Sequence, residues 1–178
     1  MDIVIRDAIP DDAAAIAGIL NPIIVSGLYT ALDTPFSVEY ERAFIERFPA
    51  RGIFHVALLD GEIVGFQNVE PFATYTSAFD HVGVIGTYVS LERRQRGIGG
   101  RLFAATFAAA RRKGFEKLFA FVRADNPVAL QAYRRQGFDT IGTARRHARI
   151  AGRFVDEIMI EAWLPEDVPP QPAETPRR

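Results

Sequence analysis

Two β-rich runs in the middle of the chain, Ile53–Leu59 and Glu62–Val69, are separated only by Asp60-Gly61. Asp-Gly is favoured in two-residue turns because both residues tolerate the positive φ angles that such a turn requires. A turn of this length joins adjacent antiparallel strands, so the two runs are predicted to form a β-hairpin. Any fold assigned to the chain must contain this antiparallel pair.

The hydrophobic pattern places further elements on both sides of the hairpin. Pro10-Asp11-Asp12 marks a helix start, because Pro fits a first turn and acidic residues favour the positive end of a helix. The predicted order is β-α-α-β-β-β-α-β-α-β-β, which indicates an α/β (α+β) fold. Further strands are expected at Ile3–Ile5, Val82–Ser90, Lys117–Val122 and Phe154–Trp163, and helices from Ala13, over Ser37–Phe48, over Gly99–Lys113 and over Pro127–Gln136. The strand that this order places just before Phe154–Trp163 has no assigned bounds.

The length allows one domain. At roughly 100–200 residues per domain, a chain of 178 residues has no room for a second catalytic domain. We therefore expect a single domain over residues 1–164. Residues 165–178 hold five prolines without apolar periodicity, a pattern typical of a disordered tail.

Residues 13–32 form a stretch of 20 positions without a charge, formally long enough to cross a bilayer. Asn21-Pro22 lies at its centre, and Pro interrupts helices because it lacks an N–H and clashes with the preceding turn. We expect a buried helix, a break at Asn21-Pro22 and a second element, and no contact with a membrane. Charges also interrupt the apolar N-terminus, so a secretory signal is not expected and a cytoplasmic location is.

Composition excludes several kinds of chemistry. The chain has no cysteine, which excludes disulfides, thiolate metal sites and a cysteine nucleophile. His55, His81 and His147 fit no metal-ligand spacing, so they are interpreted as surface or core residues and no metal is expected. A formal net charge of −1 gives no basic field for nucleic acid, which is not expected as a partner. The motifs of serine hydrolases and P-loop proteins are absent.

A glycine-rich segment follows the strand predicted at 82–90 and opens the next helix. The first N–H groups of a helix have no partner within it and lie at its positive end, so they bind anions such as pyrophosphate. The interpretation as an ordinary turn on a solvated basic face has equal weight for this segment alone. A dinucleotide fingerprint is excluded, since Leu102 stands where its third glycine belongs. The segment consists of Arg94, Gln95, Arg96, Gly97, Ile98, Gly99 and Gly100, with Arg93 and Arg101 on either side.

A second pattern lies at Asn126, Tyr133 and Gly137-Phe138. Asn is a good N-cap and Pro127 fits the first turn, so a helix is predicted to begin here. Asn126 and Tyr133 are about two helical turns apart and can face the same groove. The alternative is a capped helix with Tyr133 as a core aromatic and a glycine stop.

Together, the two patterns resemble the GCN5-related N-acetyltransferase (GNAT) superfamily over about residues 2–164. Its acyl-CoA signature [Q/R]-x-x-G-x-[G/A] is matched by Arg94, Gly97 and Gly99, and its Asn…Tyr…Gly-Phe element by the second pattern. The branch of phosphinothricin and amino-acid N-acetyltransferases is the more similar one. Its features are matched by Asn21, the Asp60-Gly61 hairpin, Tyr88-Val89-Ser90 and Gly152-Arg153-Phe154-Val155-Asp156.

The resemblance implies a mixed, mostly antiparallel sheet that splays between its fourth and fifth strands, with helices on both faces. It also implies that the pantetheine arm of acetyl-CoA lies in the gap and that no metal takes part. An amine would attack the thioester, a backbone N–H near Tyr88 or Val89 would stabilise the oxyanion, and Tyr133 would protonate the thiolate. Asn126 and the segment 94–100 would complete the acetyl-CoA site.

The acceptor site is less clearly marked. Phosphinothricin acetyltransferases carry a catalytic Glu four residues before the Tyr of Tyr-Val-Ser, where this chain has Val84. Proton removal would then fall to Glu70, to Asp80 or to water, although acids beside a loop are more often simply solvated. Phe72, Tyr75 and Phe79 of the loop after Glu70 would wall the acceptor site.

The function implied is acetyl-CoA-dependent N-acetylation of a small-molecule amine, such as an amino acid or an analogue like phosphinothricin. Two alternatives stay open, namely a catalytically silent acyl-CoA-binding sensor and an acetyltransferase of a protein amine. A homodimer is also considered. The sequence does not identify the acceptor, the base, the oligomeric state or the preferred acyl chain.

Overall fold

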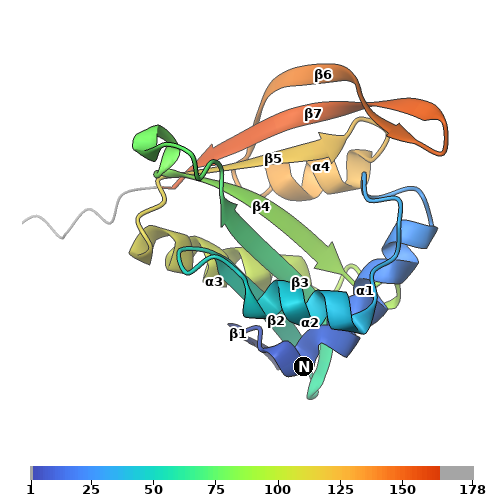
Figure 1. Cartoon of the computed structure of the whole chain (residues 1–178), viewed down its shortest axis with the longest axis vertical. Helices are drawn as coiled ribbons and strands as arrows, with labels where there is room; N and C mark the ends of the chain where they lie inside the picture. The colour runs from blue at the N-terminus through green and yellow to red at the C-terminus, as the bar shows by residue number, and fades with distance from the viewer. Residues whose placement is uncertain (1, 165–178) are drawn as a thin grey trace, which may run out of the picture.

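A computed structural model describes residues 2–164. The segment 165–178, predicted to be a disordered tail, lies outside the described residues. The described part forms a seven-stranded sheet of order β1-β2-β3-β4-β5-β7-β6 (Figure 1). Its strands are β1 (Ile3–Asp7), β2 (Ile53–Leu59), β3 (Glu62–Pro71), β4 (Val82–Val89), β5 (Lys117–Arg123), β6 (Asp139–Ile150) and β7 (Arg153–Trp163), and its helices are α1 (Ala13–Val25), α2 (Val38–Glu46), α3 (Ile98–Arg112) and α4 (Pro127–Arg134), with short 3-10 turns η1 (Pro10–Asp12), η2 (Ser77–Phe79) and η3 (Leu91–Arg93).

Within residues 2–164 the sheet is mostly antiparallel, and the one parallel pair is β4 with β5. These two strands pair only at their first residues, Val82–Val84 against Lys117–Phe119, and then diverge (Figure 1). The splay between the fourth and fifth strands was implied by the sequence resemblance, and the fold class is confirmed.

The predicted hairpin is confirmed by its turn. Asp60 and Gly61 have φ angles of 51° and 85°, both positive as this turn requires. The strands pair on either side of it, starting from Leu59 opposite Glu62. The local signal therefore determines this part of the sheet.

Helices cover both faces of the sheet. Alternate residues of a strand point to opposite faces, so β2 contributes to two cores. Phe54 and Val56 pack with α1 and α2 on one face. Ala57 and Leu59 pack with α3 on the other. Because both of its faces are covered, β2 is buried along almost its whole length.

The first helix differs from its prediction at Pro22. α1 continues through Pro22, so the predicted break is wrong. Pro22 lies on the exposed side of the helix, as does Gly18, whose carbonyl loses its helical partner there. Water can hydrogen-bond to that carbonyl, and the burial of Ile23 and Ile24 favours one more turn. No helix in residues 2–164 is long and apolar enough to cross a membrane.

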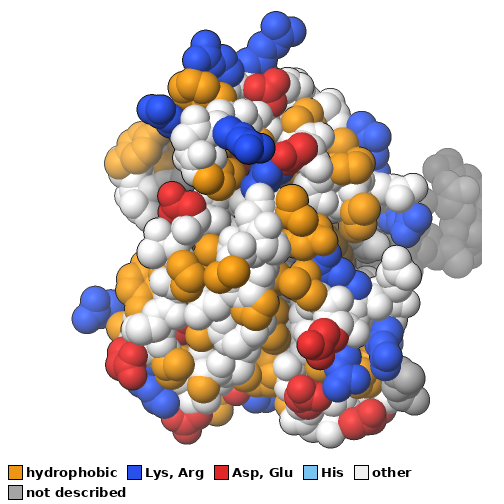
Figure 2. Space-filling view, turned by 90° about the vertical axis from the view of Figure 1, so that its right-hand side faces the viewer, with side chains coloured by type: hydrophobic (Ala, Val, Ile, Leu, Met, Phe, Trp, Pro, Cys, Tyr) orange, Lys and Arg blue, Asp and Glu red, His pale blue; other side chains and the backbone are white. Residues whose placement is uncertain are grey.

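The side of the molecule at the right of Figure 1 includes α1 and the loop after it. Apolar side chains gather across the middle of this side, and charged side chains lie mainly above and below them (Figure 2). Neither sign of charge forms a continuous field there.

Candidate active site

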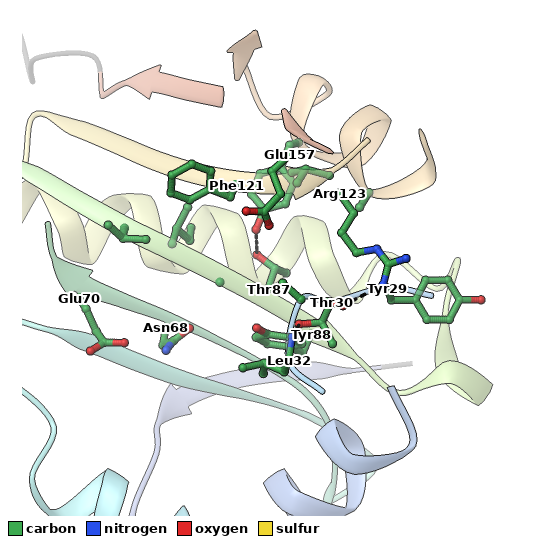
Figure 3. Close-up of a pocket in the computed structure, with 17 residues that line it drawn as sticks. Tyr29, Thr30, Leu32, Asn68, Glu70, Thr87, Tyr88, Phe121, Arg123 and Glu157 are labelled. Carbon is green, nitrogen blue, oxygen red and sulfur yellow. Dashed lines mark hydrogen bonds between the residues drawn. The ribbon is translucent and has the colours of Figure 1, made fainter. Parts of the chain in front are cut away.

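The gap between β4 and β5 forms a cleft of about 400 Å³ (Figure 3). Its walls come from β3, β4, β5, β7, α4 and the loop after α1, so segments far apart in the sequence meet around it. Apolar side chains cover much of the wall. Its non-aromatic polar side chains are Thr30, Asn68, Glu70, Thr87, Arg123 and Glu157.

The edge of β4 that faces the gap has free backbone groups. The Ser90 N–H donates to the Val64 carbonyl at 2.9 Å, so Ser90 turns its backbone groups toward β3. Backbone groups alternate in direction along a strand, so those of Thr87 and Val89 turn toward the gap. Pairing of β4 with β5 ends at Val84. A ligand in the gap therefore meets an unpaired strand edge.

The glycine-rich turn leads from β4 into α3. Gly97 precedes the helix with a φ of 79°, a conformation that glycine adopts without strain. A Cβ placed at Gly97 or Gly99 would meet no atom within 4 Å beyond the adjacent backbone. The N–H groups at the start of α3 are thus open to a ligand. The guanidinium carbon of Arg94 lies 4.0 Å from the ring centre of Tyr29, which lines the cleft.

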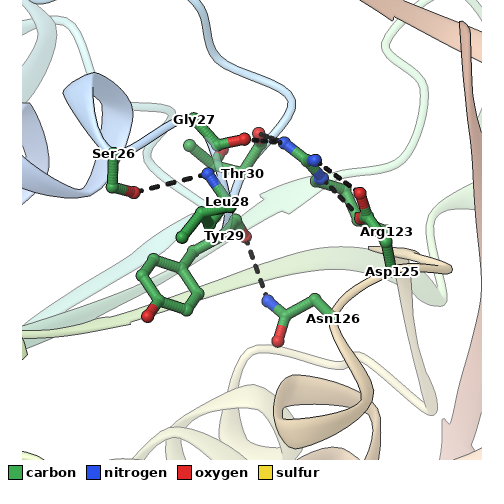
Figure 4. Close-up of polar contacts among 8 residues, drawn as sticks. All are labelled: Ser26, Gly27, Leu28, Tyr29, Thr30, Arg123, Asp125 and Asn126. Atoms are coloured by element: carbon green, nitrogen blue, oxygen red, sulfur yellow. Dashed lines mark hydrogen bonds and ion pairs between the residues drawn. The ribbon is translucent and has the colours of Figure 1, made fainter.

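The predicted cap of α4 is confirmed. The Asn126 side chain accepts a hydrogen bond from the Ala129 N–H at 3.1 Å, which is the contact of an N-cap. Its amide also donates to the Tyr29 carbonyl at 3.3 Å (Figure 4). Asn126 therefore fixes both the start of α4 and the loop after α1.

Tyr133 of α4 is at once a core aromatic and a polar group of the cleft. Its ring packs edge-on against Phe103 and Phe138. Its hydroxyl lies on the cleft wall and donates to Thr87 Oγ1 at 3.1 Å. Burial raises the pKa of Tyr133, so the phenol keeps its proton at neutral pH.

Gln67 of β3 is the cross-strand partner of Thr87 and fixes its side chain. Gln67 is buried, and its Nε2 donates to Thr87 Oγ1 at 2.7 Å. A chain of three polar side chains thus runs from the core through Thr87 to the hydroxyl of Tyr133.

Glu70 of β3 is a half-buried carboxylate on the cleft wall. It is the cross-strand partner of Val84, and directly opposed side chains lie on the same face of a sheet. Removal from water disfavours the charged form, so burial raises the pKa of Glu70. A carboxylate in this environment is suited to accept a proton from a molecule in the cleft.

Arg123, at the end of β5, fixes the loop that closes one side of the cleft (Figure 4). Its side chain is 6% exposed, and its guanidinium donates to both carboxylate oxygens of Asp125, at 2.8 and 2.7 Å. It also donates to the carbonyls of Gly27 and Thr30, at 2.8 and 3.1 Å. Hydrogen bonding to Asp125 is the main cause that raises the pKa of Arg123.

Glu157 of β7 lies on the opposite wall from Glu70 (Figure 3). Glu157 is 8% exposed. His147 Nε2 is 3.9 Å from Oε2 of Glu157, which is too far for a hydrogen bond. His147 also stacks on Phe121, with ring centroids 5.3 Å apart, and Phe121 lines the cleft.

The structure brings some of the sequence-predicted residues together and leaves others apart. Glu70, Tyr88 and Tyr133 line the cleft. Val89 follows Tyr88 on the β4 edge, and the glycine-rich turn is joined to the cleft through Arg94. These positions are compatible with the roles predicted for them.

Phe72, Tyr75 and Asp80, predicted for the acceptor site, lie outside the cleft lining. Phe72 packs against Phe79, with centroids 5.2 Å apart. Tyr75 is 83% exposed, and Asp80 forms an ion pair with Arg51 at 3.4 Å. Their role in acceptor binding stays a prediction.

Sequence reasoning missed the loop 29–32, Thr87, Arg123 and Glu157. Arg123 and Thr30 are 93 positions apart, and no local pattern reports such a contact. The nearest signal is Asp125, an acid placed beside Arg123 just before the helix cap. Within residues 2–164, no group of three or more His, Cys, Asp or Glu side chains is arranged to hold a metal ion.

Known proteins share this architecture. Residues 25–138 match the model of the acetyltransferase (GNAT) family. The L-methionine sulfoximine/L-methionine sulfone acetyltransferase of Pseudomonas aeruginosa is 26% identical over 159 residues, which cover 85% of this chain and 89% of that protein. The phosphinothricin N-acetyltransferase of Streptomyces coelicolor is 23% identical over 167 residues, covering 92% and 97%.

A solved structure gives the same fold. The GNAT superfamily phosphinothricin acetyltransferase from Sinorhizobium meliloti, in complex with acetyl-CoA, has a TM-score of 0.85 to this chain. The two are 24% identical, and the match covers 98% of this chain and 95% of the other. With the family match extending over more than half of its length, the chain belongs to the acetyltransferase (GNAT) family and is an N-acetyltransferase.

Proposed function

We propose that the chain transfers the acetyl group of acetyl-CoA directly to the primary amine of a small molecule. The observation that carries this proposal is that the Tyr133 hydroxyl and the Glu70 carboxylate line one cleft beside an unpaired strand edge. Direct transfer needs no covalent enzyme intermediate, which suits a chain without cysteine.

Acetyl-CoA is proposed to bind with its pyrophosphate against residues 94–100 and its pantetheine arm along β4. The open backbone at Gly97 and Gly99 supports the first contact. The edge formed by Thr87 and Val89 supports the second, because the amides of the arm can pair with it as an added strand does. The proposed donor site consists of Tyr88, Val89, Arg94, Gln95, Arg96, Gly97, Ile98, Gly99, Gly100, Asn126 and Tyr133.

In the proposed reaction, Glu70 accepts a proton from the ammonium group of the acceptor. The freed amine attacks the thioester carbon, and the N–H of Val89, which faces the gap, stabilises the oxyanion. The carbon–sulfur bond then breaks with its electron pair on sulfur, and Tyr133 donates its proton to the thiolate. The second amine proton returns Tyr133 to the phenol, and Glu70 releases the first to solvent.

The names of the relatives support an amino acid or an amino-acid analogue as the acceptor. A cytoplasmic location is part of the proposal, and a chain without cysteines is compatible with it. A silent acyl-CoA sensor would keep the glycine-rich turn but would have no use for a half-buried carboxylate such as Glu70 on the cleft wall.

The test is turnover by the purified protein. Acetyl-CoA is offered with amino acids, amino-acid analogues and polyamines in turn, released thiol is measured, and the acetylated product is identified by mass spectrometry. We expect thiol release that depends on an amine. Binding of acetyl-CoA without thiol release for any amine would identify a sensor, and modification of a protein amine alone would identify a protein acetyltransferase.

A further inference from the structure

The cleft is lined by more acidic than basic side chains. Among the residues of the described range 2–164 that line it, Glu70 and Glu157 are carboxylates and Arg123 is the one Lys or Arg. The cleft therefore contains two carboxylates on opposing walls and a single guanidinium at one end. This excess of negative charge determines which acceptor can bind at a low free-energy cost.

The guanidinium of Arg123 is already engaged. Asp125 takes two of its hydrogen bonds and neutralises its charge, and the carbonyls of Gly27 and Thr30 take two more. A carboxylate entering the cleft would have to displace these partners, which also fix the cleft wall. Arg123 is thus a structural cation and is not available to an acceptor.

The loops beside the cleft supply no replacement. Residues 26–37 and residues 71–81 contain neither Lys nor Arg. Arg94 stacks on Tyr29 from the glycine-rich turn, where the proposed pyrophosphate would take its charge. His147, which stacks on Phe121, has its Nε2 atom 3.9 Å from a carboxylate oxygen of Glu157.

We infer that the cleft selects amines whose carboxylate is absent or masked, and discriminates against free α-amino acids. The inference rests on the proposed function and narrows its acceptor class from amino acids and their analogues to the analogues that carry no free carboxylate. An unpaired carboxylate loses solvation in a cleft and gains nothing from Glu70 and Glu157, which repel it. An ammonium group, in contrast, finds a carboxylate on either wall.

Pairs of compounds that differ only in the carboxylate test this directly. They are L-leucine with 3-methylbutylamine, L-phenylalanine with 2-phenylethylamine, and L-ornithine with putrescine. We expect kcat/KM to be roughly 10- to 100-fold higher for the member without the carboxylate, the range that one charged hydrogen bond is worth. In the first two pairs that member is also the more strongly protonated amine, so easier deprotonation cannot produce the preference.

Two variants link the preference to the cleft. Glu157→Gln removes one repelling charge, and adding Phe121→Arg to that variant places a cation on the cleft wall, so both changes should move the ratio toward the amino acid. The control is Glu46→Gln, the same chemical change on the exposed surface of α2, which should leave the ratio unchanged.

A kcat/KM equal or higher for the amino acid in the wild-type protein overturns the inference while leaving the proposed function intact. Absence of thiol release with every amine instead contradicts the proposed function. Calorimetry of each pair with the protein and CoA then still measures the charge preference as an affinity ratio. Equal affinities within the pairs would overturn the inference in that case.

Discussion

Glu70 of β3 and Val84 of β4 are cross-strand partners, and both side chains line the cleft. Directly opposed residues place their Cβ atoms about 4.5–5.5 Å apart on one face of the sheet. The sequence resemblance implies a catalytic Glu at the position that Val84 occupies. The carboxylate of Glu70 thus approaches the same region of the cleft from the neighbouring strand, and we propose that it replaces an acid at position 84.

Glu70→Gln removes the proposed base and keeps the shape of the side chain. We expect kcat/KM to fall by about 10²–10⁴-fold, the usual contribution of a positioned base. Adding Val84→Glu to this variant should restore part of the loss, because a carboxylate then re-enters the same region of the cleft. Steady-state kinetics on the three proteins test this. An unchanged rate in Glu70→Gln would show that water, and not Glu70, accepts the proton of the acceptor ammonium.

The stability of the fold should also depend on Glu70. Burial raises its pKa in the folded state, so it contributes stability at low pH that is lost as pH rises through that raised pKa. The Gln variant carries no such penalty. Thermal unfolding should therefore show a higher Tm for Glu70→Gln than for wild type at pH 7–8, with the difference shrinking as the pH approaches the ordinary Glu pKa of about 4.3. A constant difference would show that ionisation of Glu70 is not involved.

Tyr133→Phe removes one hydroxyl and keeps the ring between Phe103 and Phe138. If Tyr133 is the acid, kcat should fall by at least about 10²-fold, while the affinity for acetyl-CoA and the Tm stay near wild type. A purely structural role predicts nearly full turnover and a stability loss of about 0.5–1.5 kcal/mol for the missing hydrogen bond. Stopped assays give kcat, and calorimetry gives the acetyl-CoA affinity and the Tm. Together they distinguish the acid role from the structural role.

Local signals were sufficient for most of the fold. The Asp60-Gly61 turn and the Asn126 cap depend on residues adjacent in the chain, and both have the predicted form. The break expected at Pro22 depended on something the sequence does not contain, namely that this side of α1 faces solvent. The helix-breaking tendency of Pro22, taken alone, therefore predicted the wrong end for α1.

The site was only partly predictable, for a related reason. The glycine-rich turn and Tyr133 follow from short motifs and from the family resemblance. That Glu70 lies opposite Val84 depends on the register between β3 and β4, and the loop between these strands carries no turn signal that fixes it. The contact of Arg123 with Thr30 depends on tertiary packing over 93 positions.

Thr87 is expected to hold the Tyr133 hydroxyl in place. Thr87→Val removes the hydroxyl that contacts both Tyr133 and Gln67, at 3.1 and 2.7 Å. We expect kcat to fall by about tenfold, an intermediate effect because Tyr133 itself remains, with KM for acetyl-CoA little changed. Thr87→Ser retains the hydroxyl and should restore most of the rate. If Ser and Val variants are equally impaired, the role of Thr87 is packing alone.

Gly99→Val tests the proposed pyrophosphate site at the start of α3. Gly99 has no positive φ angle, and a Cβ placed there meets no atom within 4 Å beyond the adjacent backbone, so we expect the variant to fold. The valine would instead occupy the space above the helix N–H groups. We expect acetyl-CoA affinity to fall by about tenfold or more, because charged hydrogen bonds to the phosphates are lost.

The matched control for this prediction is Gly18→Val. Gly18 is an exposed glycine inside α1 with equally open surroundings, so the same substitution there reports the intrinsic helix effect of valine alone. Calorimetry should show wild-type acetyl-CoA affinity for Gly18→Val and weakened binding for Gly99→Val, at similar Tm values. Undiminished binding by folded Gly99→Val would place the pyrophosphate away from the turn. The branched valine side chain is expected to block close approach of a phosphate to those N–H groups.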